Sequence, residues 1–412
     1  MKTTSAIIIG AGQTGLAMSQ ALSSRRIPHV VLERGAVGEA WRSQRWDSLC
    51  MLTPNWANGL PQAPYNGPDP HGFMTPDEFA GQLEKYVRDF ALPVKENINV
   101  NRVWHDSTHF RVDTSDGPIA AESVILATGA ASRPNVPSFA DDVPEWIFQI
   151  TLDRYKNPRN LPNGGVLVVG GSASGVQMAR ELRNAGRPVI LSTGNHVRLP
   201  RRYRNRDIET WLDVTGVLDQ LTTEIGDVER AKRLPSPQLQ GGTDDVDLNA
   251  LQSIGVSIVG RFSAIRDGEA LFSGGLSHVA NSADLKMNRL FDLADAWIEE
   301  HGVADEIAPA DRPGATVVPV NPRLSIPFDG GEIRSIVWAT GFRPDFSYVD
   351  LPVFDRRGDL IHSGGVCTVP GLFVMGLPFL RRRRSHHISG VAKDAQELGD
   401  LIAKHLRLWR AA

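Results

Sequence analysis

Hydrophobic residues near the start of the chain form a continuous apolar run, then a helical spacing, then a second apolar run. The run AIIIG (6–10) is typical of a strand buried on both faces of a parallel sheet. Residues 16–22 read as a helix, and HVVLERG (29–35) reads as a second strand. The same order returns about 160 positions later in GVLVVGG, SGVQMARELRNAG and RPVILSTG (165–194). The pattern therefore predicts two strand–helix–strand units, each with a glycine-rich turn after its first strand.

The rest of the chain alternates between irregular stretches, helices and further strands. Residues 41–75 are rich in Trp, Pro and Gly, and a helix capped by Thr75, with Glu78 three residues on, is expected over 75–90. Further expected elements are strands in VNRVWHD, HFRVDTSDG, AESVILATG, GVSIVGRF, IRSIVWATGF and GLFVMGLP, a linker over 133–163, helical patterns over 205–310, and an amphipathic C-terminal helix with Leu398, Leu401, Ile402, Leu406 and Trp409 on its apolar side.

These elements predict an α/β fold with two Rossmann-like dinucleotide-binding domains, each a three-layer arrangement of helices around a sheet. The length of 412 residues agrees, because it exceeds what one ordinary core accommodates. We expect a discontinuous first domain over 1–155 and 330–412. The second domain is expected over 156–329, with a helical insertion at about 205–310.

Composition and charge narrow the class of protein. The net charge of −3 gives no basic field for nucleic acid or an anionic membrane. The N-terminal apolar run is too short for a signal peptide or a transmembrane segment. Cys50 and Cys367 lie far apart, so neither a disulfide framework nor a redox dithiol is expected, and no residues have metal-ligand spacing. A cytoplasmic protein is the expectation.

The first glycine turn has the features of a dinucleotide site. Gly10, Gly12 and Gly15 follow a strand and open a helix, where they permit a tight turn, close approach of a pyrophosphate and close helix packing. The helix N-terminus offers N–H groups to phosphate. Glu33 ends the second strand, where a carboxylate accepts ribose hydroxyls. The alternative is a glycine-rich turn without a ligand.

The segment after the first unit favours FAD as this dinucleotide. A nicotinamide dehydrogenase would normally continue its alternating strands and helices, whereas residues 38–56 form a loop bearing Trp and Arg that can cover a flavin and its phosphates. The segment VILATGA (124–130) adds a strand ending in small residues, which let the chain pass close to a nucleotide.

The second glycine turn departs from the fingerprint at one position. Gly170 and Gly175 are present, but Ser172 occupies the middle position, where its hydroxyl can donate to a phosphate oxygen. Ser192 and Thr193 stand where the first unit has its acid, so no charge repels a 2′-phosphate. Arginines follow, at Arg198, Arg201, Arg202 and Arg204, and they either bind phosphate or form a solvated basic surface. NADPH is favoured over NADH, although NADH stays possible.

The chain resembles the class B flavoprotein monooxygenases, which include the flavin-containing and Baeyer–Villiger enzymes, and in particular a bacterial branch of flavoproteins. The resemblance rests on GAGQTG, W-R-x-x-R-W-D-S-L-x-x-L-T-P, two A-T-G segments, the second glycine turn, PRRYRNRDI, VWATGFRPDF and RRRSHHISGVAKDA. It implies FAD in the first unit and NADPH in the second. The cofactor-binding residues it implies are Gly10, Gly12, Gln13, Gly15, Glu33, Arg34, Trp41, Arg42, Leu52, Thr53, Val103, Thr128, Gly129 and Gly376 for the first unit, and Gly170, Ser172, Ala173, Ser174, Gly175, Ser192, Thr193, Arg201, Arg202, Thr340 and Gly341 for the second.

Four further residues are candidates for a part in the chemistry. Thr151 stands where the family has a histidine that links NADP to flavin chemistry, and this departure bears on coupling and weakens a Baeyer–Villiger assignment. Asn55 matches an asparagine beside the flavin in related enzymes, or is a turn residue after proline. His386 and His387 follow a run of four arginines, at the expected mouth of the substrate site, and could assist proton transfer because imidazole titrates near neutrality.

The activity that the resemblance implies is the insertion of one oxygen atom from O2 into a small organic substrate, by S- or N-oxygenation or at a ketone, through a C4a-(hydro)peroxyflavin. An NAD(P)H-dependent flavin reductase or oxidase without oxygen insertion is the first alternative. A flavoprotein that binds NADP without turnover is the second. A homodimer is possible, and the substrate itself is not readable from the sequence.

Overall fold

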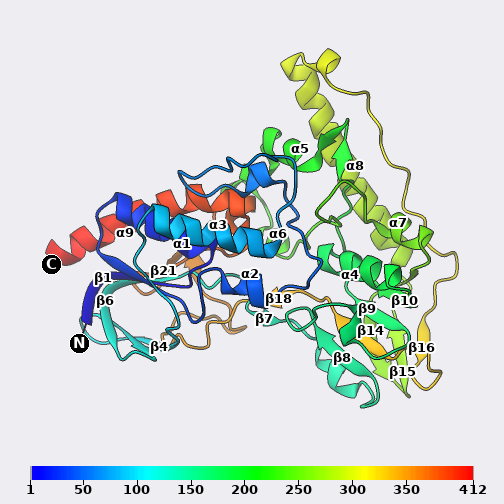
Figure 1. Cartoon of the computed structure of the whole chain (residues 1–412), viewed down its shortest axis with the longest axis horizontal. Coiled ribbons are helices and arrows are strands. Elements are labelled where there is room, and N and C mark those ends of the chain that lie inside the picture. Colours follow the sequence, from blue (N-terminus) through cyan, green and yellow to red (C-terminus); the bar gives the residue numbers. More distant parts are fainter. Residues whose placement is uncertain (1, 412) are drawn as a thin grey trace.

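The first of two sheets contains parallel and antiparallel strands and is built from both ends of the chain (Figure 1). The computed structural model describes residues 2–411. The central strands of the first sheet are parallel, in the order β21–β6–β1–β2–β3. Strands β19 and β20 extend one edge of this sheet, and β4 and β5 form a branch that pairs with β6. The bounds are β1 Lys2–Ile9, β2 His29–Leu32, β3 Val94–Lys95, β4 Val100–His105, β5 Phe110–Thr114, β6 Ile119–Leu126, β19 His362–Ser363, β20 Val366–Cys367 and β21 Leu372–Val374.

Three helices pack around this sheet, α1 (Gln13–Ser24), α3 (Pro76–Asp89) and α9 (Val391–Ala411). The expected capping box of α3 is present, because Thr75 Oγ1 accepts the Glu78 N–H and the Glu78 carboxylate accepts the Thr75 N–H. On α9, Leu398, Ile402 and Leu406 are buried as expected, but Leu401 is exposed. No helix within residues 2–411 combines the length and the apolar character needed to cross a membrane.

The second sheet is wholly parallel, in the order β13–β10–β9–β17–β8. Its strands are β8 Phe148–Thr151, β9 Val166–Val169, β10 Val189–Ser192, β13 Ser257–Val259 and β17 Ser335–Trp338, and α4 (Ala173–Asn184) packs on it. The expected α/β class with two nucleotide-binding sheets is confirmed. However, β8 and β17 lie in the second sheet, on the other side of the expected boundaries at 155 and 330, because an apolar strand pattern does not reveal which sheet the strand joins.

The insertion is less helical than expected. It contains α5 (Ile208–Val214), α6 (Val228–Lys232), α7 (Leu248–Ser253) and the long α8 (Leu276–His301), which projects away from the second sheet (Figure 1). It also holds a short hairpin of β11 (Arg202–Tyr203) and β12 (Arg206–Asp207). A separate antiparallel sheet joins β14 (Phe262–Arg266), β15 (Glu269–Phe272) and β16 (Ser325–Pro327).

A short ribbon joins the two halves of the molecule. The chain leaves the first sheet through β7 (Arg133–Pro134) and returns from the second through β18 (Phe342–Arg343), and these strands pair with each other. The Thr340 hydroxyl donates to the Asn135 carbonyl over 2.6 Å, and the Asn135 N–H donates to the Gly341 carbonyl over 2.9 Å. The two crossings therefore form one hydrogen-bonded connection.

Candidate functional site: two nucleotide turns

The turn between β1 and α1 holds the first expected site. A side chain on Gly10 would meet the Ala127 carbonyl oxygen at 2.7 Å, and one on Gly15 would collide with the Gly10 carbonyl. Gly12 is the N-cap of α1, no side chain caps the helix, and a Cβ there would meet no atom within 4 Å. Packing thus requires glycine at the outer positions. The middle position faces open space before an uncapped helix N-terminus, an arrangement suited to a phosphate.

The turn between β9 and α4 repeats this geometry. Side chains on Gly170 and Gly175 would collide with backbone carbonyls, as at the first turn. Ser172 has φ −87° and ψ −176°, while Gly12 has φ −80° and ψ −178°. Both residues are extended, so the middle position does not need the conformational freedom of glycine. Serine therefore costs the fold little, and its side chain matters only to a ligand.

The residues after Ser172 are arranged as in the first unit. Ala173 and Ser174 begin α4, and the Ser172 hydroxyl makes no capping hydrogen bond. Gly171 packs against Thr193, where an added Cβ would collide with the threonine hydroxyl. The second turn is thus shaped like a nucleotide turn down to its flanking residues.

Glu33 lies at the end of β2 as expected, and it holds the first turn in shape. Its Oε2 accepts the Ala11 N–H over 2.7 Å, and its Oε1 accepts the Gly35 N–H over 3.0 Å. Each carboxylate oxygen has a second lone pair, so the side chain retains capacity for ribose hydroxyls.

Thr128, Gly129 and Gly376 gather at the same carboxyl edge of the first sheet. The Thr128 hydroxyl lies 3.4 Å from the phenol oxygen of Tyr348, and burial raises the pKa of Tyr348 to about 12. Gly376 has φ +83°, and a Cβ on it would lie 2.9 Å from Thr14 of α1. Ligands of open parallel sheets bind at this edge, so the expected residues are in a suitable place.

At the second sheet, Thr193 occupies the position of Glu33. The Gly10 N–H bonds to the last residue of β2, and the Gly170 N–H bonds likewise to Ser192, the last residue of β10. Thr193 therefore stands in the second unit where Glu33 stands in the first, and Ser192 directly precedes it. Ser192 does not face a ligand, however, because its buried hydroxyl donates to the Gly260 carbonyl and accepts the Phe262 N–H.

Thr151, Thr340 and Gly341 also lie at or beyond the carboxyl ends of strands in the second sheet. Thr151 ends β8 and pairs with Trp338 of β17. Its carbonyl accepts the N–H groups of Arg154 and Tyr155, while its side chain is half-buried. Thr151, the residue in place of the family histidine, therefore lies at the carboxyl edge of this sheet, where we expect the nucleotide.

The expected phosphate-binding arginines are mostly engaged elsewhere. Arg198 forms buried ion pairs with Asp247 and Asp284, and Arg204 pairs with Asp295. Arg201 is 2% exposed, pairs with Asp207 and donates to the Leu52 carbonyl over 2.8 Å. The Arg201 guanidinium is thus held by protein groups of the insertion and of the loop over 41–56, and its contact with a phosphate stays a prediction. Arg202 is exposed.

The loop over residues 41–56 starts at the first turn. Trp41 Nε1 donates to Gln13 Oε1 over 3.3 Å, beside the start of α1. Arg42 pairs with Glu84 at 2.7 Å, and the Thr53 hydroxyl donates to Asn58. Arg42 therefore has a protein partner on α3, and its contact with a cofactor stays a prediction.

Asn55 is a structural residue of this loop. Its Oδ1 accepts the Met74 N–H over 2.8 Å and its Nδ2 donates to the Asp69 carbonyl over 2.9 Å. The side chain is 5% exposed. The turn interpretation thus fits better than a catalytic role, because both ends of the amide hold the following loop.

The same loop reaches across to the second unit. The Ser48 hydroxyl and the Tyr155 phenol each donate to the Glu181 carboxylate of α4 over 2.9 Å. Lys156 donates to the carbonyls of Ser43 and Arg45. The loop thus contacts the start of α1 in the first unit and α4 in the second, and it is fastened to both units.

Two further expected residues, Val103 and Arg34, differ in their exposure. Val103 is fully buried, and both its backbone groups bond to the segment 348–350. It therefore supports the sheet rather than contacting a cofactor through its side chain. Arg34 is exposed beside Glu33 and the turn.

The segment after β21 is anchored rather than loose. Arg381 and Arg382 pair with Glu397 of α9, and Arg384 pairs with Asp213 of α5 at 2.6 Å. The guanidinium of Arg383 lies 5.0 Å from the centre of the Phe379 ring. The four arginines therefore fasten this segment to α9 and to the insertion.

His386 and His387 form a tight pair with ring centres 4.5 Å apart. Desolvation lowers the pKa of His386 to about 4, although one side of it is exposed, and lowers that of His387 to about 3. These shifts favour neutral imidazoles at pH 7, which can serve as hydrogen-bonding groups, and a part in proton transfer stays a prediction.

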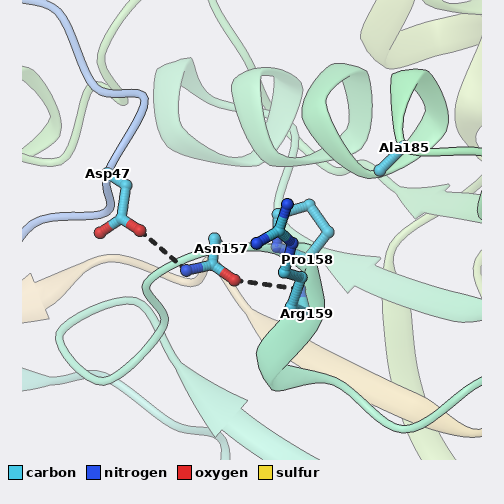
Figure 2. A pocket seen from close by; sticks show the side chains of 5 residues that line it. All are labelled: Asp47, Asn157, Pro158, Arg159 and Ala185. Atoms are coloured by element: carbon cyan, nitrogen blue, oxygen red, sulfur yellow. Dashed lines mark hydrogen bonds between the residues drawn. The ribbon is translucent and has the colours of Figure 1, made fainter.

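A pocket of about 360 Å³ lies away from both turns (Figure 2). Asp47, Asn157, Pro158, Arg159 and Ala185 line it, and Asn157 Nδ2 donates to Asp47 over 2.7 Å. Ala185 caps the C-terminal end of α4, roughly 18 Å from its N-terminus at 1.5 Å per residue. This pocket is therefore a junction between the units and not the nucleotide site.

Comparison with known proteins shows which family has this sequence and fold. Residues 7–215 match the family described as pyridine nucleotide-disulphide oxidoreductase. The chain is 32% identical over 402 residues to an uncharacterized oxidoreductase CzcO-like of Geobacillus kaustophilus (strain HTA426), covering 97% of this chain and 98% of that protein. The chain belongs to the pyridine nucleotide-disulphide oxidoreductase family. It is an enzyme of the oxidoreductase class.

Further similarities connect this oxidoreductase with monooxygenases. It is 30% identical over 231 residues to indole-3-pyruvate monooxygenase YUCCA4 of Oryza sativa subsp. japonica, covering 50% of this chain and 52% of that one. A flavin-containing monooxygenase from Stenotrophomonas maltophilia has a TM-score of 0.68 at 19% identity, covering 98% and 99% of the two chains. OTEMO in complex with FAD and NADP has a TM-score of 0.54 at 15% identity, covering 99% and 86%. The resemblance to class B flavoprotein monooxygenases is confirmed at the level of the fold.

Two buried polar residues of this oxidoreductase escaped sequence reasoning. Gln238 is fully buried, and its Nε2 donates to the Gly171 carbonyl of the second turn over 2.8 Å. Glu209 of α5 is 6% exposed, and desolvation raises its pKa to about 7. The segment SPQLQGG and the charged start of α5 gave no periodic signal, since each residue acts through contacts distant in sequence.

Proposed function

We propose that this oxidoreductase is an FAD-dependent, NADPH-consuming monooxygenase that inserts one oxygen atom from O2 into a small organic substrate. The observation that carries the proposal is the repeated turn geometry, with two uncapped helix N-termini behind matching glycine positions in one chain. One turn would hold each dinucleotide, and the loop over 41–56 is hydrogen-bonded to the helix that follows each turn. The balanced reaction is substrate + O2 + NADPH + H⁺ → oxygenated substrate + NADP⁺ + H2O.

The residues of the first turn fit FAD. Gly12 leaves room for a pyrophosphate, Gln13 and Thr14 begin the helix that faces it, and Glu33 has lone pairs for ribose hydroxyls. When bound, FAD supplies the redox centre that takes hydride from NADPH and reacts with O2. The protein's part is to hold the dinucleotides and to exclude water from the reacting centre.

The residues of the second turn fit a nicotinamide dinucleotide, with NADPH preferred to NADH. The Ser172 hydroxyl is available to a phosphate, and Thr193 places no carboxylate near a ribose 2′ position. Thr151 at the edge of this sheet bears on how efficiently reduction and oxygen insertion are coupled.

The test measures NADPH oxidation, O2 uptake, H2O2 release and product for sulfides, amines and ketones. Oxygenated product in proportion to NADPH supports the proposal. NADPH oxidation that yields H2O2 with every substrate would instead identify a flavin reductase or oxidase. Failure of NADPH to reduce bound FAD would favour a non-catalytic binding protein. A homodimer and a cytoplasmic location stay predictions.

A further inference from the structure

Two parallel strands of the second sheet end side by side at the second nucleotide turn. In the register of β10 and β13, Ser192 pairs with Val259. Two residues beyond each lie Gly194 and Arg261, so these are at the same level of the sheet edge. A Cβ on Gly194 would lie 3.4 Å from Cδ of Arg261, which shows that the arginine stem lies along the Gly194 backbone.

Arg261, like the exposed Arg202, is available to a ligand, whereas three other arginines of this region are not. Arg198, Arg201 and Arg204 are each paired with a carboxylate. Arg261 is exposed, and within residues 2–411 its guanidinium makes neither a hydrogen bond nor an ion pair. An unpaired guanidinium presents five donors in a planar fork, which suits a phosphate dianion.

The surroundings of Arg261 match the place of an adenosine ribose. Thr193 corresponds to Glu33, the position from which a carboxylate accepts ribose hydroxyls in the first unit. Gly194 follows without a side chain, and the stem of Arg261 lies alongside it, 3.4 to 3.5 Å from where a Cβ on residue 194 would stand. A neutral residue beside an unpaired arginine favours a ribose that carries a phosphate on its 2′ oxygen.

We propose that Arg261 binds the 2′-phosphate of NADPH and sets the preference for NADPH over NADH. The arginine reaches the ribose from the neighbouring strand β13, and not from the arginine-rich segment that follows β10. This inference rests on the proposed function, because it assumes that the second turn holds a nicotinamide dinucleotide.

The experiment compares the binding of NADP⁺ and NAD⁺ to the FAD-loaded protein by calorimetry, since the two ligands differ only in the 2′-phosphate. Arg261→Gln is expected to raise the Kd for NADP⁺ by about 10- to 100-fold, as for loss of one charge-assisted hydrogen-bonded contact, and to leave that for NAD⁺ unchanged. Arg266→Gln, an exposed arginine five residues later in β14, is the matched control and is expected to change neither.

Several results would overturn the assignment. One is an unchanged Kd for NADP⁺ in Arg261→Gln. Another is an equal loss of affinity for NADP⁺ and NAD⁺ in that variant, and a third is a loss of affinity for NADP⁺ alone in Arg202→Gln. Wild-type protein that binds both dinucleotides equally would also overturn it, while leaving the second turn as a nicotinamide site. Wild-type protein that binds neither would contradict the proposed function itself.

Discussion

At the scale of single residues, Ser172 is the main difference between the two glycine turns. Its backbone matches that of Gly12, so replacing it affects the ligand more than the fold. Ser172→Ala removes a hydroxyl that we expect to donate to a phosphate oxygen. The Kd for NADP⁺ should rise by about 3- to 10-fold, as for one neutral hydrogen bond, in a calorimetric titration.

Ser172→Gly provides the comparison for this variant. It also removes the hydroxyl but restores the room of the first turn, so the weakening should be smaller than in Ser172→Ala. Its unfolding free energy should differ from wild type by a few tenths of a kcal/mol, because glycine is tolerated at an N-cap. Equal NADP⁺ affinity in all three proteins would show that the hydroxyl does not contact phosphate.

Glu209 predicts a pH dependence of stability. Its folded pKa of about 7 lies above the ordinary value, chiefly because burial disfavours the carboxylate and next because Asp207 is near. Such a group contributes stability that is fully present below pH 4.5 and is lost as the pH rises through 7. Glu209→Gln should therefore be more stable than wild type at pH 8, by at most about 3 kcal/mol, and similar at pH 4.5.

Urea unfolding at both pH values measures this difference, with Glu300→Gln at the exposed end of α8 as the control. If the difference in unfolding free energy between Glu209→Gln and wild type is the same at both pH values, the Glu209 carboxyl is not held neutral by burial.

At this scale, the sequence predicted the features that depend on local backbone geometry. The glycines and Glu33 are set by a turn of a few residues, so their positions followed from spacing. The arginine roles did not follow, because the acids that pair with Arg198 lie 49 and 86 residues away along the chain. A run of arginines in sequence does not reveal such partners.

At the scale of elements, the contact between α4 and the loop over 41–56 is a testable junction. Glu181 accepts hydrogen bonds from Ser48 of the loop and from Tyr155. Glu181→Ala should lower the unfolding free energy by about 1–3 kcal/mol, because the buried Tyr155 phenol and the exposed Ser48 hydroxyl both lose a charged acceptor. Denaturant unfolding measures the loss.

Tyr155→Phe should reproduce only part of that loss, since Ser48 keeps its partner. Glu299→Ala on the exposed surface of α8 is the control and should change stability little. A Glu181→Ala protein as stable as this control would show that the loop is not held by α4.

Among the elements, apolar periodicity predicted the strands and helices of both units, including α3 with its capping box and α9. The strands β14, β15 and β16 were missed, because the insertion was read from its helical segments and β16 is separated from its partner by α8. The two-residue strands β7 and β18 carry no periodic signal at all, and they exist through pairing between distant segments.

At the scale of the whole molecule, two segments of the chain cross between the units. Each segment leaves its sheet next to a glycine turn. The assignment of β8 and β17 to the second sheet could not be read from sequence, since it depends on where the chain crosses between the units. The paired ribbon of β7 and β18 is one of the connections that hold the two nucleotide turns relative to each other.

Gly341 tests this connection. It has φ +85° at the start of the return crossing, and a Cβ there would meet no atom within 4 Å. Gly341→Ala therefore adds backbone strain of about 1–2 kcal/mol without a clash. Gly117, in the turn between β5 and β6, has φ +88° and equally open surroundings, so Gly117→Ala should cost similar stability far from the ribbon. Only Gly341→Ala should slow the reduction of bound FAD by NADPH in stopped-flow mixing, because only that variant strains the crossing. Equal slowing in both variants would mean that the ribbon does not set the geometry between the two units.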